Sequence, residues 1–110
     1  IALIVMQPSA ADVWASAAIV RMINSKRDLG GKIDAAFLIN RAMAGRNLTT
    51  EILSGEWNDY GIEQLTNYVS DRESFKRALA NGTTVFDGTD TQAKAEIEFV
   101  IAELEEAKWL

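Results

Sequence analysis

Two short runs of apolar residues, IALIVM at residues 1–6 and IDAAFLI at residues 33–39, constrain the fold most strongly. Each run is almost continuously apolar, which is typical of a strand buried on both faces of a parallel sheet. Residues 10–27 lie between them and have helix-forming composition. This alternation of strand and helix predicts an α/β layered fold with helices on both faces of a parallel sheet.

Local signals set the limits of the first two helices. Ser9 and Asp12 have the spacing of a capping box, and Gly30-Gly31 ends the segment that they open. Apolar side chains surround much of this helix, which predicts cover on more than one side: Val13, Trp14, Ala17, Ala18, Ile19, Val20, Met22 and Ile23. A weaker helix is expected over 47–60, with Gly61 as its stop and three inward residues, Leu48, Ile52 and Leu53.

The second half predicts one more strand and two more helices. A short third strand is expected at residues 62–66. Ser70 and Glu73 form a second capping-box pattern, and the helix that follows should end at Asn81-Gly82 with Phe75, Ala78 and Leu79 facing inward. The last helix carries an apolar stripe at helical spacing: Ala93, Ile97, Val100, Ile101 and Leu104.

Composition excludes several classes of site. The chain of 110 residues has the size of a single domain and contains neither cysteine nor histidine, so disulfides, the common zinc ligand sets and Ser-His-Asp chemistry are excluded. The apolar runs are far shorter than a membrane span, so a cytoplasmic protein is expected. Asp59, Asp87 and Asp90 lie in predicted turns, where aspartate is common, and no metal site is predicted. Trp14 and Trp57 are given no catalytic role.

The net charge of −5 is unevenly distributed. Residues 1–55 carry six Lys and Arg against four Asp and Glu, whereas residues 56–110 carry five against twelve. Much of the acid falls in the last helix, where a solvated face is the expected explanation: Glu96, Glu98, Glu103, Glu105 and Glu106.

The carboxyl ends of the predicted strands indicate a binding site. Parallel strands bring these ends to one edge of the sheet, where α/β proteins bind ligands. Three segments should share that rim: Gln7-Pro8-Ser9, Asn40-Arg41 and Thr66-Asn67-Tyr68. The Asn40 amide can both donate to and accept from adenine. The alternative is that Asn40 only bonds local backbone at the strand end.

A second candidate site is a basic face. Arg46 and Arg72 sit near predicted helix starts, where the helix dipole disfavours a cation, so each could serve an external phosphate. Together with Arg41, Lys76 and Arg77 they could give salt-sensitive, sequence-independent binding to DNA. The alternative is that Arg72 pairs with neighbouring acids such as Asp71 and Glu73.

Four segments, taken in order, resemble the C-terminal half of the ParA family of DNA-partitioning ATPases, and most closely its small plasmid type: IALIVMQPSAADVWASAAIV, AAFLINRAMAGRNLTTEI, LTNYVSDRESFKRALANGTTVFD and TQAKAEIEFVIAEL. The resemblance implies a SIMIBI-type P-loop NTPase fold, a homodimer formed around ATP and Mg²⁺, and non-specific binding to nucleoid DNA. It also implies a ParB-type adaptor that discharges the dimer at a centromere-like site, so that the plasmid reaches daughter cells.

Site residues follow from this resemblance position by position. Asn40 is similar to the asparagine that reads adenine, with Arg41 beside it; Pro8 and the residues Thr66, Asn67 and Tyr68 lie in loops that flank the base. Arg46 and Arg72 fall where the family places DNA-contacting arginines, with Lys76 and Arg77 beside Arg72. Asp12 matches an acid at the start of the first helix.

The resemblance also implies what this chain lacks. The Walker A lysines and the Walker B aspartate of the family would precede Ile1, so residues 1–110 are expected to be the C-terminal portion of an ATPase domain and inactive alone. Two alternatives stay open. One is a MinD-type positioning ATPase, whose membrane helix the acidic end EFVIAELEEAKWL suits poorly. The other is an α/β interaction module that binds no nucleotide.

Overall fold

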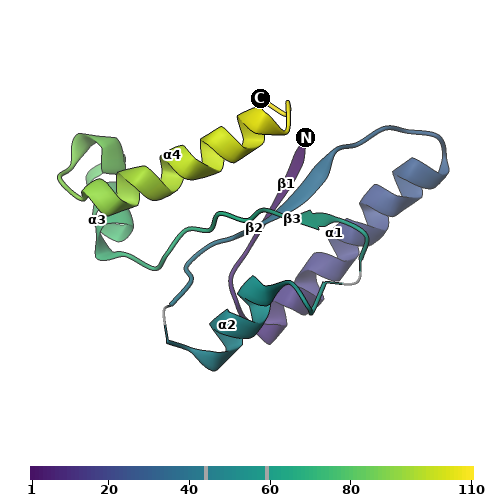
Figure 1. Ribbon diagram of the computed structural model, residues 1–110, viewed down its shortest axis with the longest axis horizontal. Coiled ribbons are helices and arrows are strands. Elements are labelled where there is room, and N and C mark those ends of the chain that lie inside the picture. Colours follow the sequence, from purple (N-terminus) through teal and green to yellow (C-terminus); the bar gives the residue numbers. More distant parts are fainter. Residues whose placement is uncertain (44, 59) are drawn as a thin grey trace.

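A three-stranded parallel sheet in the order β1-β2-β3 forms the centre of the molecule (Figure 1). The computed structural model describes residues 1–43, 45–58 and 60–110. The strands are β1 (Ala2–Met6), β2 (Ala35–Ile39) and β3 (Glu63–Gln64). Strand β2 pairs with β1 from Ala2↔Ala35 to Met6↔Ile39 and with β3 at Ala36↔Glu63 and Phe37↔Gln64. The predicted α/β fold with a parallel sheet is confirmed.

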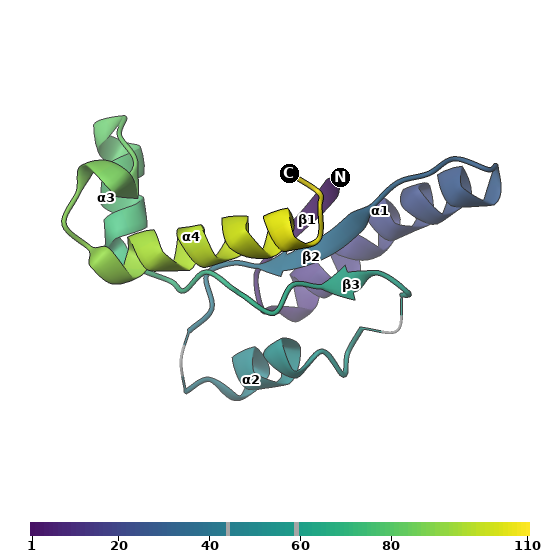
Figure 2. The same ribbon diagram turned by 45° about the horizontal axis from the view of Figure 1, so that its top comes forward.

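Helices cover both faces of this sheet, as Figure 2 shows. Helices α1 (Ala10–Asp28) and α2 (Asn47–Ser54) pack on one face, and α4 (Thr91–Glu106) packs on the other. Helix α3 (Glu73–Asn81) and the 3₁₀ turn η1 (Val85–Asp87) lie at the amino-terminal end of α4, beyond the sheet. None of the helices in the described residues is long and apolar enough to cross a bilayer.

Strand β2 contributes to both hydrophobic cores because its side chains alternate between the faces. Ala35, Phe37 and Ile39 pack with α1 and α2, whereas Ala36 and Leu38 pack with α4. All five residues of β2 are buried, as the apolar run predicts. The edge strand β1 differs from its prediction, because Val5 is 54% exposed and only Ile4 and Met6 are buried.

Helix α1 begins and ends where its signals predict. The Ser9 hydroxyl accepts a hydrogen bond from the backbone N–H of Asp12, and Asp12 in turn accepts from the backbone N–H of Gln7. Gly30 adopts a left-handed φ of 85° just after the helix. The expected cover on more than one side is wrong for the residues described, because Trp14 and Met22 are 76% and 73% exposed.

Helix α2 is shorter than predicted. It ends at Ser54, and Gly55 forms its C-cap at φ 78°, so the stop lies six residues before Gly61. Ile52 is buried, but Leu48 is 42% exposed rather than inward. After the helix, Trp57 turns into the core and its indole N–H donates to the Ile52 carbonyl at 2.9 Å.

Helix α3 starts later than predicted. Its N-cap is Arg72, without a side-chain capping bond, so the expected Ser70 cap is wrong. The Ser70 backbone N–H instead donates to Glu96 of α4. Helix α3 does end at Asn81 with Gly82 in a left-handed turn, but Leu79 is 83% exposed because α3 lies beyond the sheet.

Candidate functional site

The carboxyl ends of β1 and β2 meet at one edge of the sheet. The backbone N–H of Asn40 donates to the Met6 carbonyl at 2.8 Å, which places Asn40 beside the end of β1. Asn40 is half-buried, and its side-chain amide makes no hydrogen bond to any of the described residues. Within residues 1–43, 45–58 and 60–110, the bond to local backbone that the alternative role requires is not present.

Arg41 follows Asn40 in an unusual backbone conformation. Its φ of 57° lies in the left-handed region, which costs a side-chain-bearing residue on the order of 1 kcal/mol. Strain of this kind concentrates at functional sites. After Arg41 the chain still pairs with its neighbour, because Ala42 forms a parallel bridge with Ser70.

The predicted rim is divided between two hollows. The first is a groove of about 660 Å³ that brings together Asn40, Arg41, Arg72 and Lys76. Apolar side chains also line this groove: Val5, Leu38, Phe75, Leu79 and Ile97. The second, of about 320 Å³, is lined by Thr66, Asn67, Tyr68, Ser70, Arg72, Glu96 and Phe99. Arg72 borders both hollows. Pro8 lies in the turn after β1 and lines neither of them.

Residues 65–71 explain how the second hollow forms. Three backbone N–H groups of this segment continue a ladder along β2 and the residues after it: Leu65 to Phe37, Val69 to Ile39 and Asp71 to Ala42, at 2.8, 3.0 and 2.9 Å. Between the first two of these bonds the segment bulges out of the sheet. The N–H groups in the bulge need other acceptors, because unpaired backbone groups are costly to bury.

Two glutamates of α4 accept hydrogen bonds from this segment, one in the bulge and one after it. Glu103 accepts from the backbone N–H groups of Thr66 and Asn67 at 2.8 and 2.9 Å and from the Asn67 side-chain amide at 2.9 Å. Glu96 accepts from the backbone N–H of Ser70 at 2.8 Å. The two carboxylates lie two helical turns apart, so α4 holds this segment at the bulge, through Glu103, and again just after it at Ser70, through Glu96.

Sequence reasoning missed both glutamates. The expectation of a solvated acidic face holds for the exposed Glu98, Glu105 and Glu106 and is wrong for Glu96 and Glu103. A signal was present: residues 96 and 103 are seven apart and border the apolar stripe of the same helix. Side chains with that spacing lie along one helix face and can reach an adjacent segment.

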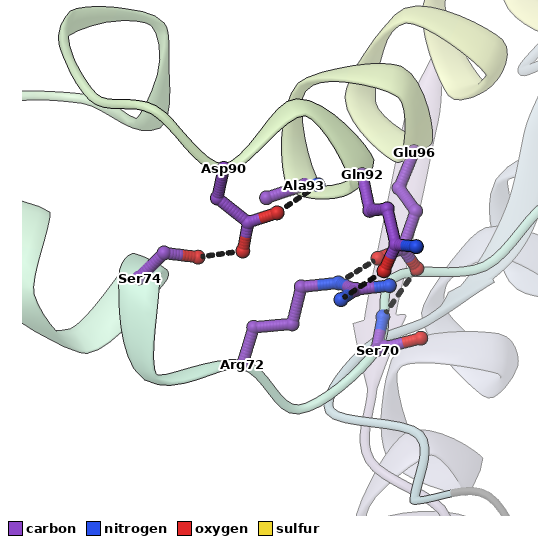
Figure 3. Close-up of polar contacts among 7 residues, drawn as sticks. All are labelled: Ser70, Arg72, Ser74, Asp90, Gln92, Ala93 and Glu96. Carbon is purple, nitrogen blue, oxygen red and sulfur yellow. Dashed lines mark hydrogen bonds and ion pairs between the residues drawn. The ribbon is translucent and has the colours of Figure 1, made fainter.

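Arg72 lies inside a network of acceptors from α4 (Figure 3). Its Nε donates to Glu96 and its Nη1 donates to the Gln92 side chain at 3.2 Å. The hydrogen bond to Glu96 raises the pKa of the Arg72 guanidinium above its ordinary value, with a further contribution from the Asp90 charge. Arg72 therefore pairs with an acid, as the alternative to phosphate binding proposed, but the partner is Glu96 of another helix and not Asp71 or Glu73.

Asp90 supports the same corner of the molecule. Its carboxylate accepts from the backbone N–H of Ala93 at 3.0 Å as the N-cap of α4, and from the Ser74 hydroxyl at 2.7 Å (Figure 3). These two hydrogen bonds lower the pKa of Asp90 below its ordinary value. Asp90 thus joins the starts of α3 and α4.

The other predicted DNA-binding cations do not form one surface. Lys76 and Arg41 both approach Asp71, at 3.3 and 3.7 Å, and Arg77 lies 3.6 Å from Glu73 on an exposed helix face. Arg46 is the N-cap residue of α2, which packs on the opposite face of the sheet from α4. The predicted basic face is thus split, and four of its five members, Arg72 included, lie near carboxylates.

No group of three metal-ligating side chains occurs within residues 1–43, 45–58 and 60–110. Asp87 bonds the backbone of Thr84 and Asp90 caps α4, in keeping with turn roles for both. Asp59 lies outside the described residues. Trp57 packs in the core against Phe37, and Trp14 points to solvent.

Comparison with known proteins gives one informative similarity. Over 84 residues the chain is 32% identical to maintenance of carboxysome distribution protein A of Halothiobacillus neapolitanus (strain ATCC 23641 / c2). The match covers 76% of this chain and 38% of that protein, so the chain spans well under half of its relative. No family model matches the chain. The similarity supports a ParA-like relationship at the level of the family.

Proposed function

We propose that this chain is the base-reading and DNA-contacting portion of a ParA-like positioning ATPase, with a plasmid as its cargo. Two things support the proposal: the relative with a role in carboxysome distribution, and the position of Asn40. The position of Asn40 carries the nucleotide part of the proposal. A half-buried amide that makes no hydrogen bond to the described residues lies at the carboxyl edge of a parallel sheet, where α/β folds bind ligands.

In this proposal Asn40 pairs with the adenine edge of ATP, and Arg41 lies beside the base. Pro8 and the loop residues Thr66, Asn67 and Tyr68 flank the nucleotide. The Asn67 side-chain amide already donates to Glu103, so we assign Asn67 to holding the loop and not to a hydrogen bond with adenine. The grip on the phosphates and on Mg²⁺ belongs to parts of the intact enzyme that are not among these residues.

Nucleotide binding by the full-length protein tests the assignment of Asn40. Asn40→Ala removes two base hydrogen bonds of about 1 kcal/mol each, so ATP affinity should fall by roughly thirtyfold. Asn81→Ala, at the exposed end of α3, is the matched control and should leave affinity unchanged. Calorimetric titration with ATP and ADP gives the measurement. Equal affinity in the two variants would remove Asn40 from the site, and no binding by the wild type would favour a nucleotide-free interaction module.

The DNA part of the proposal assigns phosphate contacts to Arg46 and Arg72, with Lys76 and Arg77 next to Arg72, in a dimer formed with ATP. The double variant Arg46→Ala/Arg72→Ala should weaken binding on every DNA sequence. The slope of log affinity against log salt should flatten by about 0.9 for the contact of Arg46 and by up to the same amount again for that of Arg72. Arg21→Ala, an exposed arginine on α1, is the control. A salt slope equal to that of Arg21→Ala would contradict the assignment.

A further inference from the structure

The guanidinium of Arg72 already binds a carboxylate within the chain. Nε donates to Glu96, and the Arg72 and Glu96 side chains are only 26% and 16% exposed. The ion pairs of Lys76 and Arg77 are more open, with cation exposures of 51% and 77%. Solvent and salt screen exposed pairs strongly and buried pairs much less. Of these three pairs, the one at Arg72 is therefore the most persistent.

Glu96 is also held from its other side. Its second carboxylate oxygen accepts from the backbone N–H of Ser70, so the carboxylate bridges the loop and the guanidinium (Figure 3). If the Glu96 side chain turned away from Arg72, the backbone N–H of Ser70 would lose its acceptor. The carboxylate therefore stays beside Arg72.

A carboxylate and a phosphate use the same donors of a guanidinium. Both accept charge-assisted N–H···O bonds from its fork, often two at once. With Glu96 on Nε and Gln92 on Nη1, a DNA phosphate has fewer donors available and approaches a site whose charge is largely neutralised. Asp90, which also acts on the Arg72 charge, adds to this effect.

We propose that Glu96 is an internal competitor for Arg72, a carboxylate that occupies the arginine in place of a DNA phosphate and thereby limits DNA affinity. The inference rests on the proposed role of Arg72 in DNA contact. Glu96 acts through Arg72 and touches no DNA itself. Its removal should make DNA binding tighter, whereas loss of a merely structural contact should not.

The test compares Glu96→Gln with Glu98→Gln in the full-length protein with ATP. Both variants remove one negative charge from α4, but Glu98 is exposed and has no contact with Arg72 among the described residues. Glutamine keeps one oxygen for the Ser70 N–H. Fluorescence anisotropy with random-sequence duplex DNA across a salt series should show that only Glu96→Gln steepens the slope of log affinity against log salt, by up to about 0.9, as Arg72 gains the share of one phosphate contact that Glu96 withholds in the wild type. Adding Arg72→Ala to Glu96→Gln should abolish the gain.

A change in the opposite direction makes the test independent of how well Glu96→Gln folds. Gln92→Glu places a second carboxylate at Nη1 on the exposed side of Arg72 and should weaken binding and flatten the slope. Ala102→Glu, also exposed on α4, adds the same charge elsewhere as its control. If Glu96→Gln behaves like Glu98→Gln, or Gln92→Glu like Ala102→Glu, the competitor role is overturned. If the wild type binds no DNA at any salt, the proposed function fails at its DNA step and the inference falls with it.

Discussion

Phe37→Ala is expected to lower the free energy of unfolding by about 3–5 kcal/mol, the usual cost of deleting a buried phenyl ring. Phe37 is fully buried in the central strand. Its ring centroid lies 5.1 Å from that of Trp57 in an edge-on contact and 6.3 Å from that of Tyr60. Alanine would leave a cavity under both rings. This loss is a large share of the free energy of unfolding of a typical domain, which is about 5–15 kcal/mol.

Urea denaturation followed by circular dichroism measures the effect. Phe99→Ala is the control, because Phe99 is 61% exposed on α4 and its loss should change stability by about 0.5 kcal/mol or less. Phe37→Leu should fall between the two, since leucine refills part of the space. Equal midpoints for Phe37→Ala and Phe99→Ala would show that the ring cluster does not stabilise this core.

Glu103→Ala should cost about 2–3 kcal/mol, more than most surface substitutions. The carboxylate is the acceptor for the N–H groups of Thr66 and Asn67 and for the Asn67 amide. Its removal leaves three donors around a bulge that the sheet cannot satisfy. Water can replace the acceptor at the exposed Thr66, so most of the cost comes from the part-buried backbone N–H and side-chain amide of Asn67.

Glu106→Ala tests whether this cost is specific, because Glu106 is exposed on the same helix and should be close to neutral. Glu103→Gln, which keeps one acceptor oxygen, should lose less than Glu103→Ala. Amide hydrogen exchange adds a local measurement: protection should fall at Thr66 and Asn67 before it falls in β2. Unchanged exchange at these two amides would rule out the role that we give Glu103.

The sequence predicts the features that depend on neighbours along the chain. The apolar runs give β1 and β2, and Ser9 and Gly82 mark helix limits because capping and left-handed turns are local chemistry. The position of Asn40 at the sheet edge also follows, since the end of a buried strand in a parallel sheet fixes where the next residue lies.

Features that depend on distant residues were not predicted. Ser70 has the spacing of a helix cap. In the structure, however, its backbone N–H donates a hydrogen bond to Glu96, which lies on another helix, α4. Leu79 has the spacing of a core residue, but α3 lies beyond the sheet and leaves it exposed. The ion pair of Arg72 with Glu96 joins residues 24 positions apart, a distance at which helical periodicity carries no information.

The alternation of β2 has a consequence for cooperativity. Phe37 and Ile39 belong to the layer of α1 and α2, while Ala36 and Leu38 belong to the layer of α4, so a single strand of five residues is shared by both. Neither layer keeps its packing surface if this strand leaves the sheet. The two sides of the molecule are therefore thermodynamically linked. A shift of β2 by one residue in its register would turn each of its side chains from one helix layer to the other.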